Sequence, residues 1–278
     1  MPVIEIDKMP ITFKNSPIVE LIAEFHWDTA CQTMSSAPNS VGAPPSIIAN
    51  PSMQENFFMQ FSGRIFQSGF QQLERLVPHG FPLFARQPVF RFRSTTRTEV
   101  LYQVGPGFFS ANALPPYKTW ESFVPVVRDG ILALLQSRDG SEQDLPFSLS
   151  SLRYIDAFKK PLTKDLDIGA FMAEVLGVEI NLPVGITKHG DPEKKIKQSL
   201  QLQMPTPSGA TMHIGIGEGV ANGDLAFMLD TNVIAKNQIN ADVDSAMQSL
   251  EVAHSMIHEL FFDITKPIAE LMKPSEEI

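Results

Sequence analysis

The stretch Val89–Leu114, VFRFRSTTRTEVLYQVGPGFFSANAL, decides how this chain folds. At its start Phe90 and Phe92 alternate with Arg91 and Arg93. Because successive side chains of a strand point to opposite faces, the phenylalanines should face a core and the arginines should face away from it. Two more apolar segments follow, separated by a Gly-Pro-Gly sequence that is typical of a turn. The stretch therefore predicts a meander of antiparallel strands.

The same patterns predict elements on both sides of this meander. Alternation predicts strands at residues 17–27, 148–159, 184–189, 199–204, 211–217 and 225–235. Helical spacing of apolar residues predicts helices at 53–77, 117–136, 166–176 and 243–272, with a kink at Pro267. The order strand, helix, run of strands, helix occurs twice. We therefore expect an α+β fold of two similar halves, each an antiparallel sheet with long amphipathic helices packed on one face.

The expected halves are residues 1–147, which include a long loop at 29–52, and residues 148–278, an acidic half that ends in a long helix. The loop is rich in Ala, Ser, Pro and Asn, and such a segment buries little apolar surface. Long loops in compact domains are often functional, so this one is either a partner-contact element or a solvated excursion. Ser52 and Glu55 form a capping-box pattern at the start of the following helix.

Composition narrows the class of protein. An apolar fraction of 43% and a charged fraction of 19% are ordinary for a globular chain of 278 residues. The single cysteine, Cys31, fits a reducing compartment and excludes an intrachain disulfide framework. The first residues do not resemble a secretory signal, and no apolar stretch approaches the length of a membrane span. We expect a cytoplasmic protein that does not enter a membrane.

The net charge of −9 is unevenly distributed. Residues 1–160 carry equal numbers of basic and acidic side chains, so the whole excess of negative charge lies in residues 161–278. Every arginine falls in the first part. Because binding to nucleic acid requires concentrated positive charge, this balance disfavours a nucleic-acid partner, although a local basic face on the first part stays open.

Several segments carry a resemblance to a known family. They are NSPIVELIAEFHW, FRFRS, VLYQVGPGFFSANALPPYKTWESF, SLRYID and LEVAHSMIHELFFDIT, in this order along most of the chain. In them the chain resembles a sporadically distributed family of uncharacterised bacterial proteins. The resemblance implies an accessory or defence-type role and supplies no site residues. The chain departs from the family pattern in the Ala/Ser/Pro-rich insertion after Trp27 and around Gly217–Asp224.

Four arginines form the best candidate site for an anionic partner: Arg86, Arg91, Arg93 and Arg97. Guanidinium groups bind carboxylates and phosphates through paired hydrogen bonds, and Arg91 and Arg93 should share one sheet face. The alternative is a solvated strand face on which the arginines pair with acids such as Glu99.

His254 and His258 stand one helical turn apart, a spacing that can ligate zinc. In the protease motif a glutamate follows the first histidine directly, but here Ser255 holds that position. His254 also falls on the apolar stripe of its helix, which favours a hydrogen-bonded core histidine. We predict no metal and no cofactor.

No other segment carries a catalytic pattern. The glycines between Gly215 and Gly219 do not open a helix, so a hairpin turn is favoured over a phosphate loop. No G-x-S-x-G sequence occurs. Arg153 and Asp156, in the strand RYID, suggest an ion pair that joins the two halves.

Enzymatic activity is therefore left open, and the sequence favours a non-enzymatic interaction protein. It should bind a protein or an anionic partner through a sheet face. The alternative is a small-ligand or nucleotide-binding protein, a hydrolase among the options, with a pocket ringed by Arg91, Arg93 and a carboxylate such as Asp230. Self-association is compatible with plentiful sheet edges, but no heptads specify it.

Overall fold

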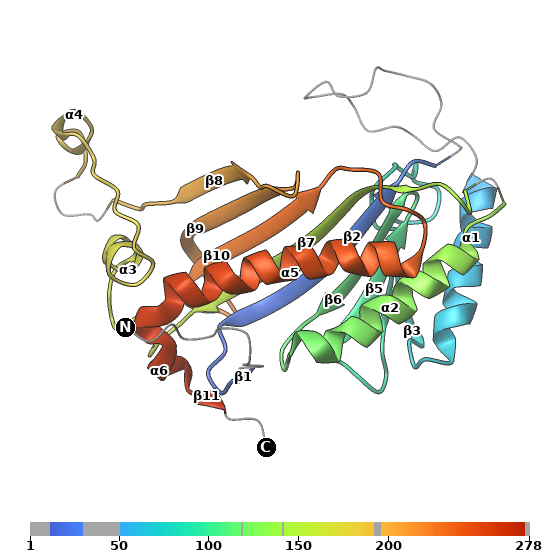
Figure 1. Ribbon diagram of the computed structural model, residues 1–278, viewed down its shortest axis with the longest axis horizontal. Coiled ribbons are helices and arrows are strands. Elements are labelled where there is room, and N and C mark those ends of the chain that lie inside the picture. Colours follow the sequence, from blue (N-terminus) through green and yellow to red (C-terminus); the bar gives the residue numbers. More distant parts are fainter. Residues whose placement is uncertain (1–11, 30–50, 118, 141, 192–195, 276–278) are drawn as a thin grey trace.

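The computed structural model describes residues 12–29, 51–117, 119–140, 142–191 and 196–275. Within these residues nine strands form one antiparallel sheet in the order β3-β4-β5-β6-β2-β7-β10-β9-β8 (Figure 1). The strands are β2 (Ile18–Trp27), β3 (Gln72–Arg75), β4 (Phe90–Arg93), β5 (Val100–Gly105), β6 (Phe108–Ala113), β7 (Phe147–Phe158), β8 (Leu200–Pro205), β9 (Thr211–Ala221) and β10 (Asp224–Ala235). A separate short pair joins β1 (Thr12–Phe13) to β11 (Pro274–Ser275).

The predicted fold class is wrong, because the chain builds one sheet and not two halves with a sheet each. The two predicted halves meet where β2 pairs with β7, from Ile18 opposite Asp156 to Trp27 opposite Phe147, with a register shift near each end. Strand β7 also pairs with β10 along nine residue positions. Alternation tells which face a side chain occupies, but it does not tell which strand lies beside it. The boundary expected at 147/148 falls at the start of this central strand.

The helices are α1 (Pro51–Phe66), α2 (Trp120–Ser137), α3 (Ile168–Glu174), α4 (Val184–Thr187), α5 (Val243–Thr265) and α6 (Ala269–Met272), with a 3₁₀ turn, η1, at Lys266–Ile268. In Figure 1, α2 and α5 lie in front of the sheet, and α1 lies beside α2. The side chain of Thr119 caps α2 by accepting from the Ser122 amide, and that of Asp242 caps α5 by accepting from the Ser245 amide. Among the described helices none is both long and apolar enough to cross a membrane.

One apolar core fills the space between these helices and the sheet. On β2 it takes Leu21, Ala23, Phe25 and Trp27, which alternate with partly exposed residues on the other face. Helix α1 contributes Phe61, whose ring packs edge-on against rings of β4, β5 and β6. The main core therefore lies on one side of the sheet, and a small second cluster of Ala157, Ala221 and Ala226 lies on the other side.

Several local predictions also need correction. Helix α1 ends at Phe66, and Leu73 belongs to the edge strand β3. Ser52 lies inside α1, so the expected capping box at its start is wrong. Residues 184–187 form the short helix α4 and not a strand. The last long helix ends at Thr265, and Pro267 lies in the following 3₁₀ turn.

Two further predictions concern the glycine-rich segment 215–219 and the long loop 29–52. The glycines 215–219 lie inside β9, and the hairpin turn follows at Asn222 and Gly223, so the turn expected at Gly215–Gly219 is wrong. Most of the expected loop 29–52 lies outside the described residues.

Candidate functional site

The sheet face away from the helices, which we call the open face, carries a mixed set of polar and aliphatic side chains. Strand register places them in rows across the central strands. One row runs Asn112, Ile22, Arg153, Asn232; the next runs Ser110, Glu24, Ser151, Ile234; a third runs Glu20, Ile155, Asp230. Polar groups and branched aliphatic groups therefore alternate on the same face of the sheet, where Ser110, Asn112 and Ser151 are buried and the other residues of these rows are partly exposed.

An ion pair occupies the middle of the open face. The Nε and Nη2 atoms of Arg153 donate to the two carboxylate oxygens of Asp230 at 2.7 and 2.5 Å. This two-bond contact with Asp230 raises the pKa of Arg153, with Glu20 and Glu24 adding to the effect and partial burial opposing it. The two hydrogen bonds hold the planar guanidinium group in one orientation.

The ion pair expected between Arg153 and Asp156 is absent from the described structure. Residues three apart in a strand point to opposite faces, and Asp156 lies on the helix side of β7. The pairing of β7 with β10 could not be read from the sequence, so Asp230 was not recognised as the partner of Arg153.

Other polar groups of the open face hold each other through hydrogen bonds. The Asn112 amide donates to the Glu20 carboxylate at 2.8 Å. The Ser151 hydroxyl donates to Asn232 Oδ1 at 2.8 Å. Because their partners lie on neighbouring strands, these side chains keep fixed positions without a ligand. Glu20 and Glu24 are not among the predicted site residues, although their alternation with apolar residues in PIVELIAEFHW is a sequence signal for this face.

The structure separates the four predicted arginines. Arg91 and Arg93 lie on the open face of β4, as alternation predicts, and Arg91 donates to Glu74 at 3.1 Å. Arg86 precedes β4 and pairs with Asp28 at 2.9 Å, while Arg97 lies in the turn after β4. These two therefore flank opposite ends of the strand, and the four do not form a single cluster.

The predicted nucleotide pocket lacks the required geometry. Five strand spacings separate β4 from β10, which corresponds to about 24 Å between the two strands across the sheet, and Arg91 and Asp230 also lie in different rows. The two groups lie too far apart to ring one small ligand.

A cluster of titratable and aromatic side chains lies on the helix side, between α2, β7 and α5. The Tyr154 hydroxyl and His254 Nδ1 share a hydrogen bond of 2.9 Å, and the Trp120 ring stacks on His254 at 4.6 Å. The Trp120 indole N–H donates to both carboxylate oxygens of Glu251 at 3.0 and 3.1 Å. These contacts make His254 a hydrogen-bonded, half-buried histidine between α5 and the sheet.

Burial sets the charge states in this helix-side cluster. It lowers the pKa of His254 to about 4, with His258 adding to the effect, and it also lowers the pKa of His258. Burial raises the pKa of Asp156 to about 7, with Asp230 adding to it. No group of metal-binding side chains occurs among the described residues.

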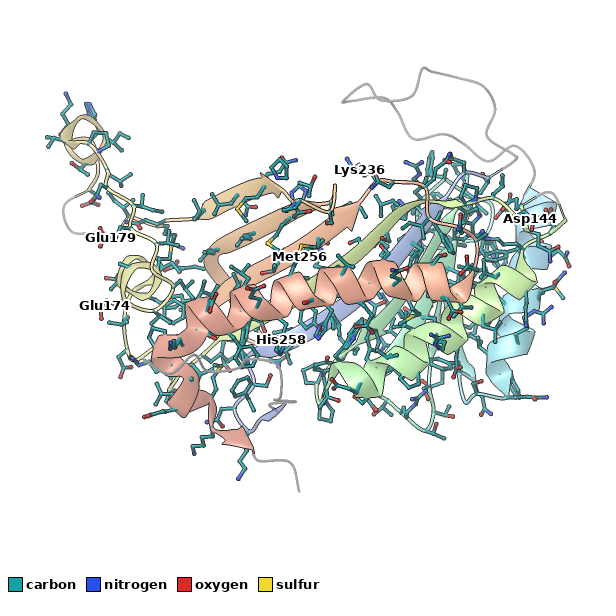
Figure 2. The ribbon with its side chains drawn as sticks, viewed as in Figure 1. Asp144, Glu174, Glu179, Lys236, Met256 and His258 are labelled. Carbon is teal, nitrogen blue, oxygen red and sulfur yellow. The ribbon has the colours of Figure 1, made fainter. Side chains whose placement is uncertain are left out.

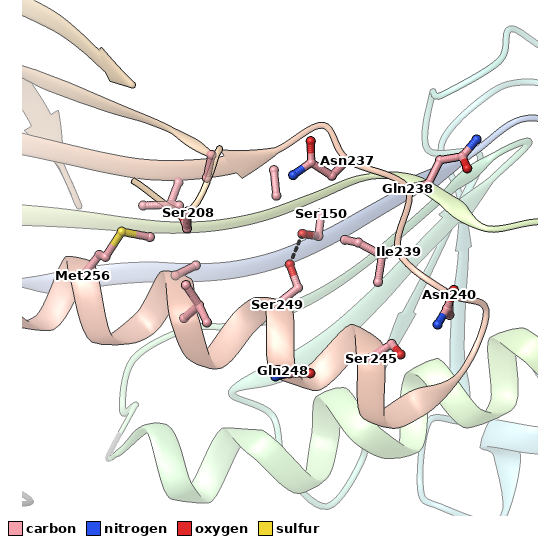
Figure 3. Close-up of a pocket in the computed structure, with 15 residues that line it drawn as sticks. Ser150, Ser208, Asn237, Gln238, Ile239, Asn240, Ser245, Gln248, Ser249 and Met256 are labelled. Carbon is pink, nitrogen blue, oxygen red and sulfur yellow. Dashed lines mark hydrogen bonds between the residues drawn. The ribbon is translucent and has the colours of Figure 1, made fainter. Parts of the chain in front are cut away.

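A cavity of about 340 Å³ lies on the other side of α5 (Figure 3). Figure 2 shows Met256, which lines this cavity, and His258 on opposite sides of the helix. The lining contains serine, amide and apolar side chains and no charged group, and Ser150 and Ser249 share a hydrogen bond across it. This chemistry suits an uncharged molecule and not a phosphate.

Comparisons of the chain with protein-family models, curated proteins and solved structures find no match.

Proposed function

We propose that this chain is a non-enzymatic interaction protein that binds a protein partner through the open face. The observation that supports this most is the fixed Arg153–Asp230 pair surrounded by Ile22, Ile155 and Ile234. Arginine and apolar groups near the centre of a polar surface are the composition of binding hot spots. Preorganised side chains also lower the entropy lost on binding.

Charge favours a protein over a nucleic acid as the partner. The middle of the open face holds the carboxylates of Glu20, Glu24 and Asp230 around one arginine. Arg91 and Arg93 provide positive charge on β4, three and more strands away from this acidic region. A polyanion would meet repulsion at the centre, whereas a folded partner can present complementary charges at both places.

The alternative function, small-ligand binding, is supported by the cavity beside α5 and by no feature near the arginines. Its uncharged lining favours a neutral molecule over a nucleotide. A cytoplasmic location, and the accessory or defence role that the family resemblance implies, remain part of the proposal.

Site-specific photo-crosslinking in the native cell tests the proposal. A photoreactive amino acid at Asn232 reports on the open face, and the same group at Leu132, which is 46% exposed on α2, serves as the control. We expect one specific crosslinked protein from the Asn232 position alone. Equal crosslinking from both positions, or none from Asn232, contradicts the proposal.

The captured partner then allows a quantitative test with purified proteins. Arg153→Ala should weaken binding by about 2 kcal/mol or more, as central arginines do. The double variant Arg153→Asp with Asp230→Arg keeps an ion pair in the sheet but reverses its direction, so it should preserve the fold and still lose binding. An unchanged dissociation constant in both variants contradicts a role of the open face.

A further inference from the structure

The two outer strands of the sheet differ in how they are protected from further pairing. Strand β3 has four residues, two of which, Glu74 and Arg75, are charged. Strand β8, with the sequence LQLQMP, has six residues and no charge. Charged side chains and short length are the usual devices that keep an edge strand from pairing with another chain. Among the described strands, β8 is the edge that lacks both.

Apolar side chains of β8 are left partly uncovered on the helix side. Leu202 and Met204 lie opposite Ile214 and Met212 of β9, which are buried. Leu202 itself is 39% exposed and Met204 is 41% exposed. Figure 1 shows why: α5 runs across the middle of the sheet, and β8 lies beyond it.

The backbone of β8 has a fixed polarity. The Thr206 amide donates to the Ala210 carbonyl at 2.8 Å, on the line of pairing that continues along β8 and β9. Backbone groups alternate in direction along an antiparallel strand, so even-numbered residues point to β9 and odd-numbered residues point outward. Gln201 and Gln203 therefore direct their N–H and C=O groups to the free edge. Pro205, which has no N–H, occupies an outward position where none is needed.

We propose that β8 pairs antiparallel with β8 of a second copy of this chain, about a two-fold axis at Leu202. In this register Gln201 lies opposite Gln203 of the second copy, and the outward backbone groups of both residues form hydrogen bonds. Leu200 lies opposite Met204, and Leu202 lies opposite its own copy. Apolar side chains thus meet apolar ones on the helix side, and glutamines meet glutamines on the open face. The two sheets become continuous.

A second copy fits this edge better than an unrelated strand because the segment is self-complementary, as a two-fold interface requires. Like charges that face each other across a strand pair destabilise it. Strand β8 has no charged side chain, so two copies of it bring no like charges opposite each other. Since the remaining outer strand, β3, is charged and short, the assembly stops at a dimer and does not continue as a fibre.

Disulfide trapping tests the register directly, in a background where Cys31 is replaced by serine. Residues facing each other in a non-hydrogen-bonded antiparallel pair have Cα atoms about 4.5 Å apart, which a disulfide can span. The Leu202→Cys variant should form a disulfide-linked dimer under mild oxidation. The Leu200→Cys variant should not, because its two copies lie about 13 Å apart, but it should crosslink when mixed with Met204→Cys.

The oligomeric state in solution gives a second measurement. Light scattering should give a mass of about twice 30.8 kDa for the wild-type chain. Leu202→Lys places two like charges opposite each other and should weaken the dimer by about tenfold or more. Leu132→Lys, at a leucine of similar exposure on α2, should leave it intact. Gln203→Pro removes an outward N–H that the monomer does not use, so it should weaken the dimer. Gln203→Thr keeps this N–H and should leave the dimer intact.

A monomeric wild-type chain overturns the proposal. So does a dimer that survives both Leu202→Lys and Gln203→Pro with folded circular-dichroism spectra. If the Leu202→Cys variant forms a disulfide only with another protein in cells, the edge receives a foreign strand and the second-copy assignment is wrong. Crosslinking of a partner from Asn232 is independent of these outcomes, so this inference and the proposed function can fail separately.

Discussion

Replacing Asp156 by asparagine should stabilise the folded chain at neutral and alkaline pH and leave its stability unchanged in acid. Asp156 is 4% exposed on the helix side of β7. Burial raises its pKa from 3.8 to about 7, with Asp230 adding to the effect. A buried carboxyl group is most stable in its neutral form, and an asparagine is neutral at every pH.

Proton linkage gives the sign and the size of the effect that Asp156 has on the free energy of unfolding. Between pH 3.8 and about 7 the folded chain holds the Asp156 proton more tightly than the unfolded chain does. Stability therefore falls as the pH rises through this window, and the loss is complete above it. Each pH unit corresponds to about 1.4 kcal/mol, so the full loss is about 4 kcal/mol. Asp156→Asn removes this loss.

Urea unfolding of both proteins at several pH values between 4 and 8 measures the effect. The difference in free energy of unfolding should grow with pH and level off near pH 7. His254 and His258 titrate with the opposite sign, because their lowered pKa values destabilise the fold as the pH falls, but both proteins share them. Asp224→Asn, at an exposed carboxylate on β10, is the control. A difference that is constant with pH refutes the reasoning.

Two predictions concern packing between the helices and the sheet. Gly130→Ala should destabilise the fold by about 1–3 kcal/mol, because a Cβ there would lie 2.7 Å from the Phe109 ring. A Cβ at Gly63 in α1 would meet nothing within 4 Å, so Gly63→Ala should stabilise the fold by about 0.5–1 kcal/mol. Equal changes of the melting temperature in the two glycine variants would contradict this. Phe61→Ala should cost about 3–5 kcal/mol, whereas Met59→Ala, at a residue 74% exposed, should stay within about 0.5 kcal/mol in the same assay.

Local patterns in the sequence predicted individual elements well where one face is buried. The meander at 89–114 and the helix expected at 117–136, observed at Trp120–Ser137, have clear periodicity. The branched residues of the segment 184–189 suit a strand, yet Val184 and Ile186 lie exposed in the short helix α4. The sequence also does not predict that the two expected halves share one sheet, because the strands that join them, β2 and β7, are over a hundred residues apart in the chain.

The candidate site was predictable only in part for the same reason. Alternation placed Arg91 and Arg93 on the open face correctly. The central ion pair needed the knowledge that β7 lies beside β10, which pattern alone does not contain. The sequence alone does not show which residue pairs with Asp230. Its role appears once pairing brings it to within hydrogen-bond distance of Arg153.

In strand β7, residues that face the helices alternate with residues on the open face, so stability and binding should depend on different residues. Between residues 149 and 156 its odd positions, among them Arg153 and Ile155, lie on the open face, and its even positions, among them Tyr154 and Asp156, lie against the helices. If the open face recognises a partner, alanine at the partly exposed odd positions Arg153 and Ile155 should weaken binding and change stability little. Alanine at Ser150 or Tyr154 should change stability first, because each substitution removes a hydrogen bond to α5. Binding losses that follow stability at both parities would mean that partner recognition depends on the fold as a whole and not on this surface.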